Sequence, residues 1–399
     1  MRIIYPVPEI FPDPRARFIQ IVHTCNALAE KGVEVILMVG IKRGYPRERV
    51  LEFYGVPEHP NLKVIGMPII RREQKRHFRF SSHGVFHFSL LLHLFFRRSY
   101  RNRETVLFLR HIKLADFVMK LRRFLQNPVV FEAHEVFHFA VHHERKRDRI
   151  RDLESKVYRS VDGIVSISRT IKEQLASFGV LPEAIHVVHN GVEMEWFTIT
   201  RTLPGSSICY TGSLYPWKGV DTLIVAMKYL PDEKLLIVGG GKRMEELKRL
   251  AATEGIAERV SFAGAIPRTE IPGYLSHSKV AVLPNTPSVP SQFSSPLKLF
   301  EYMACGIPIV ASALPVFQEI LTDERNAVLF EPGNPHSLAA AIKKLIDNPG
   351  LAARIGNTAK EDARNYTYDK RAEKIAGLME ELLKRTRPSS QEDTRLVKI

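Results

Sequence analysis

Two series of alternating strand and helix patterns constrain the fold of this chain more than any other feature. In each series, short apolar runs typical of strands buried on both faces alternate with segments that have helical periodicity. The first series predicts strands at 2–5, 33–40, 105–110, 127–136, 162–168 and 185–193, helices at 16–31, 112–125, 151–161 and 170–179, and a proline-rich loop at 6–14. The second series predicts strands at 207–212, 234–241, 259–265, 279–285, 307–311 and 327–333, and helices at 220–230, 243–255, 271–275, 296–304, 337–347 and 370–384. This alternation predicts an α/β fold whose parallel sheets are covered by helices on both faces.

The two series have the same architecture, so we predict two doubly wound sheets in tandem. At 399 residues the chain is too long for one ordinary hydrophobic core, which favours two domains. The predicted parts are a first domain at 1–197, a second at 206–365, a helix at 366–385 that packs back on the first domain, and a tail at 386–399. Ligands of such sheets bind at the carboxyl ends of the strands, so we expect a cleft between the two facing domains.

The stretch SSPLKLFEYMACGIPIVAS has the pattern of a helix followed directly by a buried strand. Ser295 is a good N-cap, Pro296 suits the first helical position, and Gly306 ends the helix. The free N–H groups and positive dipole end of the helix favour an anion. With Glu301 one to two turns further on, the stretch suits a nucleotide, its diphosphate at the helix start and its ribose at the carboxylate. An equally weighted alternative is that Lys298 and Glu301 are an i,i+3 pair on a solvated helix.

The composition, 45% apolar and 25% charged, is that of a globular protein. Its three cysteines, Cys25, Cys209 and Cys305, lie far apart without metal-type spacing, so we expect the reducing cytoplasm rather than a disulfide framework. The N-terminus has no long apolar run behind a basic start, which predicts no signal peptide, and no stretch is apolar over the length that spans a bilayer. No cluster of carboxylates, histidines or cysteines has the spacing of metal ligands.

The net charge of +15 is unevenly placed, because a stretch at 71–103 holds nine lysines and arginines against the single acid Glu73. These basic residues flank the apolar centre SLLLHLFF. One interpretation is an interfacial element that faces anionic lipid. An equally weighted one is a core helix whose arginines lie at its solvated ends. Single-stranded nucleic acid ranks lowest, because no RNA- or DNA-binding signature accompanies the stretch.

Five motifs of the second half occur in the order and spacing of a known family. They are TGSLYPWKGVDTLI, KLLIVGGG, VSFAGAIPRTEIPGYLSHSKVAVLPN, SSPLKLFEYMACGIPIVAS and VLFEPGNP, and the first half adds QIVHTCNALAEKG, DGIVSISRTIKEQL and VVHNGVEMEWF. With these motifs the chain resembles, over nearly its whole length, the retaining GT-B glycosyltransferases of family 4. The resemblance implies two facing Rossmann-like domains that transfer a sugar from a nucleoside diphosphate to an acceptor with retention at the anomeric carbon.

The resemblance places the donor on the second domain. Lys218 matches the family lysine that contacts the diphosphate, whose departure as an anion is the main barrier. Gly212 matches the glycine at which the backbone approaches phosphate closely, and Glu301 matches a carboxylate that hydrogen-bonds the ribose. The turn that begins at Gly239 faces the base in the family, while the full dinucleotide fingerprint is absent. The other implied donor-binding positions are Ser213, Ser294, Ser295, Pro296 and Leu297.

Two departures from the family pattern concern the sugar and the phosphate. The family's sugar-holding glutamate falls at Phe293, so backbone N–H groups or Ser294 must replace it. The arginine that often follows the phosphate-binding glycine is replaced by Ser213. Lys218 and the helix dipole are therefore left with more of the leaving-group charge. We interpret these changes as a difference in donor specificity.

In the first domain, the family uses residues at strand ends to contact the transferred sugar and the acceptor. Arg110 aligns best with the family's sugar-contacting histidine, and His134 with the histidine that follows the next strand. A histidine at a strand end is more often a structural hydrogen-bonding group, which is the alternative for His134. His111, beside Arg110, is assigned to the acceptor side. Arg15 and Arg17, in the first loop, are further candidates for an anionic acceptor.

Together these features predict a retaining hexosyl- or N-acetylhexosaminyl-transferase that acts on a glycan or lipid-linked acceptor in cell-envelope polysaccharide or lipopolysaccharide synthesis. The departing diphosphate is expected to take the acceptor proton, with Lys218 as its cation. We expect no cofactor, no metal, no nucleic acid, and a cytoplasmic protein peripheral to the inner face of the membrane. The alternatives are a nucleotide-sugar epimerase or hydrolase of the same fold, or a non-catalytic membrane- or nucleic-acid-binding protein.

Overall fold

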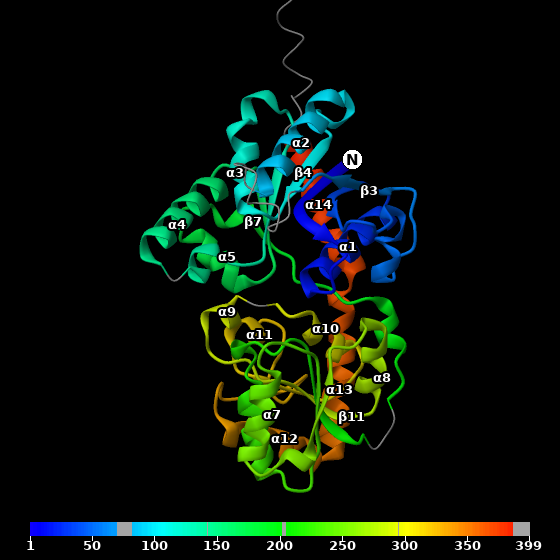
Figure 1. Ribbon diagram of the computed structural model, residues 1–399, viewed down its shortest axis with the longest axis vertical. Coiled ribbons are helices and arrows are strands. Elements are labelled where there is room, and N and C mark those ends of the chain that lie inside the picture. The colour runs from blue at the N-terminus through cyan, green and yellow to red at the C-terminus, as the bar shows by residue number, and fades with distance from the viewer. Residues whose placement is uncertain (70–81, 142, 202–204, 294, 386–399) are drawn as a thin grey trace, which may run out of the picture. The chain divides into compact units, whose positions relative to one another are not determined.

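The computed structural model describes residues 1–69, 82–141, 143–201, 205–293 and 295–385 (Figure 1). The chain divides into two compact units. Unit 1 comprises Met1–Ser166, Lys172–Val188 and the residues from Arg371 on, and unit 2 comprises Ile167–Ile171 and His189–Lys370. The change of unit at His189 lies earlier than the boundary expected at 197. The tail expected at 386–399 falls outside the described residues.

Unit 1 contains a seven-stranded parallel sheet in the order β3-β2-β1-β4-β5-β6-β7. Its strands are β1 (Arg2–Phe11), β2 (Glu34–Ile41), β3 (Leu62–Met67), β4 (Thr105–Leu109), β5 (Val129–Ala133), β6 (Gly163–Ser166) and β7 (Ile185–Val187). The helices are α1 (Ala16–Glu30), α2 (Ser82–Phe96), α3 (Ile112–Lys120) and α4 (Glu144–Tyr158), with most of α5 (Arg169–Ala176) and α14 (Tyr368–Arg385).

Unit 2 contains a six-stranded parallel sheet in the order β10-β9-β8-β11-β12-β13. Its strands are β8 (Ser207–Thr211), β9 (Leu235–Val238), β10 (Val260–Gly264), β11 (Ser278–Leu283), β12 (Ile309–Ser312) and β13 (Val328–Phe330). Its helices are α6 (Val220–Ala226), α7 (Met244–Thr253), α8 (Ile271–Ser276), α9 (Val289–Gln292), α10 (Leu297–Ala304), α11 (Pro315–Gln318), α12 (Pro335–Ile346) and α13 (Pro349–Ala363). One apolar cluster joins the sheet to α6, α7 and α12, and a second joins it to α10, α11 and α13. The predicted α/β fold with two parallel sheets is confirmed.

In each sheet the first strand lies in the interior, and the order in which the chain adds strands reverses once. The chain builds outward from β1 to β3 and returns to the other side at β4, and it does the same from β8 to β10 and then β11. In such sheets the crevice at the carboxyl ends of the two strands at the reversal is where ligands bind. The candidate ligand-binding places are therefore the carboxyl ends of β8 and β11 in unit 2, and of β1 and β4 in unit 1.

The prediction of a loop at 6–14 was wrong, because β1 continues to Phe11. Strand β4 pairs only with Arg2–Ile4, so Pro6 and Pro8 lie where β1 has β2 as its one partner. A proline is tolerated there because its missing N–H breaks no ladder on the open side. The sequence also gave no signal for β3, an edge strand whose half-exposed residues form no continuous apolar run.

Helix α10 begins one residue later than predicted. Its N-cap is Pro296 in an extended conformation, and no side chain caps the helix, so the capping role expected of Ser295 is wrong. Gly306 ends the helix region with a φ of 68°, as expected. All eight residues of α10 are buried. The alternative of a solvated helix carrying Lys298 and Glu301 is therefore wrong.

Candidate functional site

The turn after β8 is packed backbone to backbone against the turn after β9. The N–H of Gly212 donates to the carbonyl of Val238 at 2.8 Å. A Cβ on Gly239 would lie 1.9 Å from the carbonyl oxygen of Gly212, and both glycines have positive φ. A side chain at Gly239 is therefore excluded, and the end of β8 is left as an uncovered stretch of backbone.

Lys218 is held at the same end of the sheet by Gly219. Gly219 has a φ of 66°, and a Cβ there would lie 1.8 Å from the carbonyl oxygen of Pro284, directly after β11. The Lys218 side chain is half-buried and forms no ion pair with a described residue. Burial lowers the pKa of its amine to about 8. The site thus holds a poorly solvated amine that no carboxylate of the described residues pairs with.

A second lysine, Lys298, lies beside the first and was not predicted as a site residue. It is 8% exposed, and among the described residues its Nζ has no hydrogen-bond partner. The Nζ lies 3.6 Å from the centroid of the Tyr210 ring and 3.5 Å from the place a Cβ would take on Gly212. Burial, and next the charge of Lys218, hold its pKa well below the usual range. The amine of Lys298 therefore lies against Gly212, close enough to Lys218 for the two charges to interact.

Hydrogen bonds hold α10 against β8 near one end of the helix and hold the residue before the N-cap at the other. The N–H of Thr211 donates to the hydroxyl of Tyr302 at 2.8 Å, and Nδ2 of Asn190 donates to the carbonyl of Ser295 at 2.7 Å. The Oγ of Ser295 is buried without a partner among the described residues. Pro296 is the N-cap of α10, and Leu297 is its first residue.

Glu301 is also buried, and Arg268 occupies one of its oxygens. Nη1 of Arg268 donates to Oε1 of Glu301, while Nη2 donates to both oxygens of Glu193 at 2.8 Å. Burial raises the pKa of Glu301, although the charge of Arg268 opposes this. Sequence reasoning missed Arg268. Any ribose contact with Glu301 must share the carboxylate with this arginine.

The remaining residues of the predicted donor site differ in what the structure shows of their contacts and exposure. The carbonyl of Ser213 accepts a hydrogen bond from the hydroxyl of Tyr210 at 2.8 Å. Phe293 is 9% exposed, and Ser294 lies outside the described residues. Sequence reasoning also missed Asn285, two residues after β11, whose buried amide group has no partner among the described residues.

In unit 1, Arg110 and His134 lie in one buried cluster around Glu132, at the carboxyl ends of β4 and β5. Nη1 of Arg110 donates to Oε1 of Gln20 at 2.6 Å, and Nε2 of His134 lies 3.0 Å from Oε2 of Glu132. The donors to the Glu132 carboxylate are Tyr5 Oη, Gln20 Nε2 and Arg371 Nη2. The predicted pair is thus brought together, and Gln20 and Arg371 are additions that sequence reasoning missed.

His134 is neutral near pH 7 in this cluster. Burial, and next the positive charge of Arg110, lower its pKa to about 4 against the pull of Glu132. Burial works to raise the pKa of Glu132, but His134, Arg371 and Arg110 hold it below its usual range. A neutral imidazole beside a carboxylate can orient a hydroxyl group by hydrogen bonding.

The predicted acceptor-side residues lie on the surface of unit 1 or at a helix start. Arg15 pairs with Asp13 and Arg17 with Glu9, each at 2.6 Å. Both guanidinium groups lie about 5 Å from the ring of Phe18, at 5.0 and 5.1 Å. His111 is the N-cap residue of α3, without a capping bond from its side chain.

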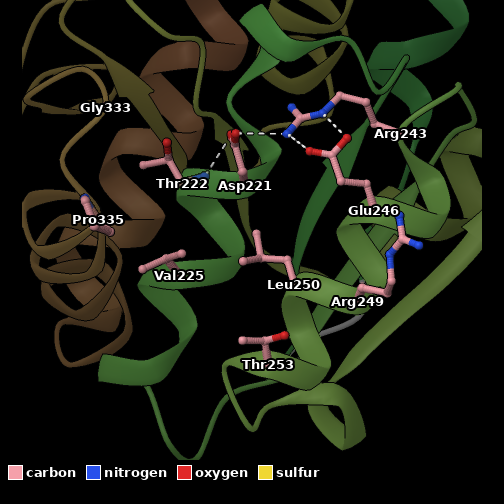
Figure 2. A pocket seen from close by; sticks show the side chains of 10 residues that line it. All are labelled: Asp221, Thr222, Val225, Arg243, Glu246, Arg249, Leu250, Thr253, Gly333 and Pro335. Carbon is pink, nitrogen blue, oxygen red and sulfur yellow. Dashed lines mark hydrogen bonds and ion pairs between the residues drawn. The ribbon is translucent and has the colours of Figure 1, made fainter.

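A surface pocket of unit 2 lies between α6 and α7 (Figure 2). Arg243 crosses its rim to Asp221 and Glu246, at 3.2 and 2.7 Å. None of the predicted donor-binding residues lines this pocket. Across the described ranges, no group of three or more histidines, cysteines or acids is placed to hold a metal ion. No described helix has the length and apolar character that crossing a membrane requires.

Both halves of the chain match family models. Residues 203–362 match Glycosyl transferases group 1, and residues 19–196 match Glycosyltransferase Family 4. The D-inositol 3-phosphate glycosyltransferase of Xylanimonas cellulosilytica is 28% identical over 254 residues, which are 58% of this chain and 60% of that protein. The chain thus spans less than two thirds of the length of curated relatives that it matches.

Solved structures match over nearly the whole chain. Sucrose-phosphate synthase from Thermosynechococcus elongatus has a TM-score of 0.76 at 20% identity, over 96% of this chain and 99% of that one. Alr3699/HepE of Anabaena, solved in complex with UDP-glucose, has a TM-score of 0.72 at 18% identity, over 96% and 100%. At these identities the likeness shows the fold. The chain therefore has the GT-B fold, and its two halves match, in series, the models of Glycosyltransferase Family 4 and Glycosyl transferases group 1.

Proposed function

We propose that the protein is a retaining glycosyltransferase that moves a sugar from a nucleoside-diphosphate sugar to a glycan or lipid-linked acceptor of the cell envelope. The observation that carries the proposal is Lys218, a poorly solvated amine that forms no ion pair with a described residue, at the strand reversal of unit 2, where Gly212 presents backbone without a side chain. Such a place suits a diphosphate. In this proposal the donor belongs to unit 2 and the acceptor to unit 1.

In the proposed reaction the bond from the anomeric carbon to the diphosphate breaks, and a bond from that carbon to the acceptor oxygen forms on the same face. The acceptor proton passes to the departing diphosphate, whose charge is stabilised by Lys218 and the N-terminus of α10. Arg110 and neutral His134 orient the sugar and the acceptor, with His111, Arg15 and Arg17 on the acceptor side.

A nucleotide-sugar panel tests the donor. We expect one of the UDP-, GDP- or ADP-sugars, at about 100 times its dissociation constant, to stabilise the protein by about 2.7 kcal/mol, or about 5 °C in melting temperature. Glu301→Ala should abolish this shift, whereas the control Glu245→Ala, on the exposed face of α7, should keep it. If no member of the panel shifts the melting temperature, the donor proposal fails.

Product analysis separates transfer from the rival activities. With the donor alone, a transferase leaves the donor essentially intact, whereas a nucleotide-sugar epimerase or hydrolase turns it over without an acceptor. A non-catalytic membrane- or nucleic-acid-binding protein turns over neither. Formation of a glycosylated acceptor is the expected result.

We further propose that the protein is cytoplasmic and attaches to the inner membrane surface through α2. Phe88, Leu92 and Phe96 follow one another at i,i+4 spacing and are 59%, 38% and 82% exposed. The opposite face of α2 is buried, so the core-helix interpretation holds for that face. Exposed Arg97 and Arg103 follow the helix, and basic groups beside an apolar stripe favour anionic lipid. The basic residues at 71–79 lie outside the described ranges.

Vesicle sedimentation tests this attachment. Wild type should sediment with phosphatidylglycerol vesicles, less so at high salt, and not with phosphatidylcholine vesicles. The combined change Phe88→Ser, Leu92→Ser and Phe96→Ser should weaken binding at least about tenfold, since burying one such side chain contributes about 1.5–3 kcal/mol. The control is Phe53→Ser with Leu181→Ser, which removes exposed apolar groups elsewhere on unit 1. Binding that ignores lipid charge and salt excludes the proposal.

A further inference from the structure

Lys298 is a buried amine whose removal from water is offset only in part by the described residues around it. Its side chain is 8% exposed, and its Nζ has no hydrogen-bond partner among the described residues. Taking an ammonium group out of water costs several kcal/mol unless a partner repays it. The face of the Tyr210 ring, 3.6 Å from Nζ, returns only part of that free energy. A buried amine kept without a partner is typical of a site whose partner is a ligand.

The direction of Lys298 identifies the kind of ligand. Its Nζ lies 3.5 Å from where a Cβ would stand on Gly212, so it points to the bare backbone after β8. Lys218 is close enough that its charge lowers the pKa of Lys298. Two ammonium groups at one poorly solvated place repel each other, and a ligand with more than one negative charge removes that repulsion.

A third group completes the set of donors. The Oγ of Ser295 is buried and unpartnered among the described residues, and Ser295 immediately precedes Pro296, the uncapped N-cap of α10. The first N–H groups of an uncapped helix are free donors at its positive end. The Lys298 amine thus lies at the end of β8 with the charge of Lys218 near it, and the Ser295 hydroxyl group and the N-terminus of α10 stand within three residues of Lys298 along the chain. This combination fits a diphosphate better than it fits a single carboxylate.

We propose that Lys298 is a second phosphate-binding cation, which holds the diphosphate of the donor together with Lys218. The inference rests on the proposed function and names a residue that the family resemblance did not. It also explains how Ser213 can stand where an arginine often follows the phosphate-binding glycine. An amine supplied by α10 takes the place of that arginine. The charge on the leaving group is then shared between two lysines from different elements.

Calorimetric titration with inorganic pyrophosphate and with UDP tests the proposal. Lys298→Met keeps the length and apolar stem of the side chain, so the free protein should be at least as stable as wild type in thermal unfolding. We expect Lys298→Met to weaken the binding of both probes at least about tenfold, and Lys298→Arg to restore part of it. The matched control is Lys279→Met, which removes a lysine of unit 2 that is already paired with Glu233.

Proton uptake gives a second readout. The titratable and charged groups that face Nζ are Lys218, Glu301, Cys209 and the ring of Tyr210. Binding of pyrophosphate favours the charged amines, so wild type should take up protons, measured as a dependence of the heat on buffer ionisation, and Lys298→Met should take up fewer. Unchanged affinity and proton uptake in Lys298→Met overturn the inference while the proposed function stands. Failure of wild type to bind pyrophosphate, UDP, GDP or ADP contradicts the proposed function itself.

Discussion

Replacing Lys218 by alanine is expected to lower sugar transfer by several hundredfold or more. In the proposed reaction the amine lies where negative charge develops as the diphosphate departs, and removing one such preorganised donor costs about 10²–10³ in turnover. Because Lys218 is poorly solvated and has no ion pair with a described residue, its charge is not screened by a neighbouring acid. Turnover at saturating donor and acceptor is the measurement.

The control for Lys218→Ala is Lys248→Ala, an exposed lysine of α7 that pairs with Glu245 at 2.9 Å. This change should leave turnover within about twofold, since exposed pairs contribute little. The pKa of about 8 for Lys218 adds a pH signature. Diphosphate binds the charged amine and raises its pKa, so donor affinity falls as pH rises above 8, and Lys218→Ala should lose this part of the dependence. Near-normal turnover in the variant refutes the assigned role.

The parallel sheets could be predicted because local patterns determine them. A strand buried on both faces, such as β12, must be apolar throughout, and the glycine that ends a helix, such as Gly306, must reach a positive φ. The part of β1 after Tyr5 was not predicted. Its prolines are tolerated in a strand only because the pairing with β4 ends at Ile4. That pairing joins residues about a hundred positions apart, and no local pattern records it.

The donor site could be predicted only in part, for the same reason. Lys218 and Gly212 stand in local turns, and the family resemblance named them. Lys298 and Glu301 have the spacing of a surface pair, and only the packing of all of α10 into the core shows them to be buried. Arg268 reaches Glu301 from 33 positions away, and it has no local sequence signal.

Replacing Arg371 by methionine is expected to lower the free energy of unfolding of unit 1 by about 3–5 kcal/mol. Arg371 is 2% exposed and donates to the carboxylate of Glu132, to Oγ1 of Thr24 at 3.1 Å and to the carbonyl of Val188 at 2.7 Å. Without it, Glu132 is a fully buried carboxylate that has lost its ion-pair partner on α14. Urea unfolding followed by far-UV circular dichroism measures the loss. Tryptophan fluorescence would follow unit 2 instead, because both tryptophans, Trp196 and Trp217, belong to unit 2.

Two further variants decide whether the cost comes from the unpaired charge. Arg385→Met, on the same helix, breaks an exposed i,i+4 pair with Glu381 and should cost about 0.5 kcal/mol or less. Combining Arg371→Met with Glu132→Gln removes the cation and the buried negative charge together, while the amide still offers an oxygen to Tyr5. The double variant should therefore be more stable than Arg371→Met alone. Equal stability of the two would mean that the cost lies in lost packing and hydrogen bonds of Arg371, since an uncompensated charge on Glu132 must be relieved when that charge is removed.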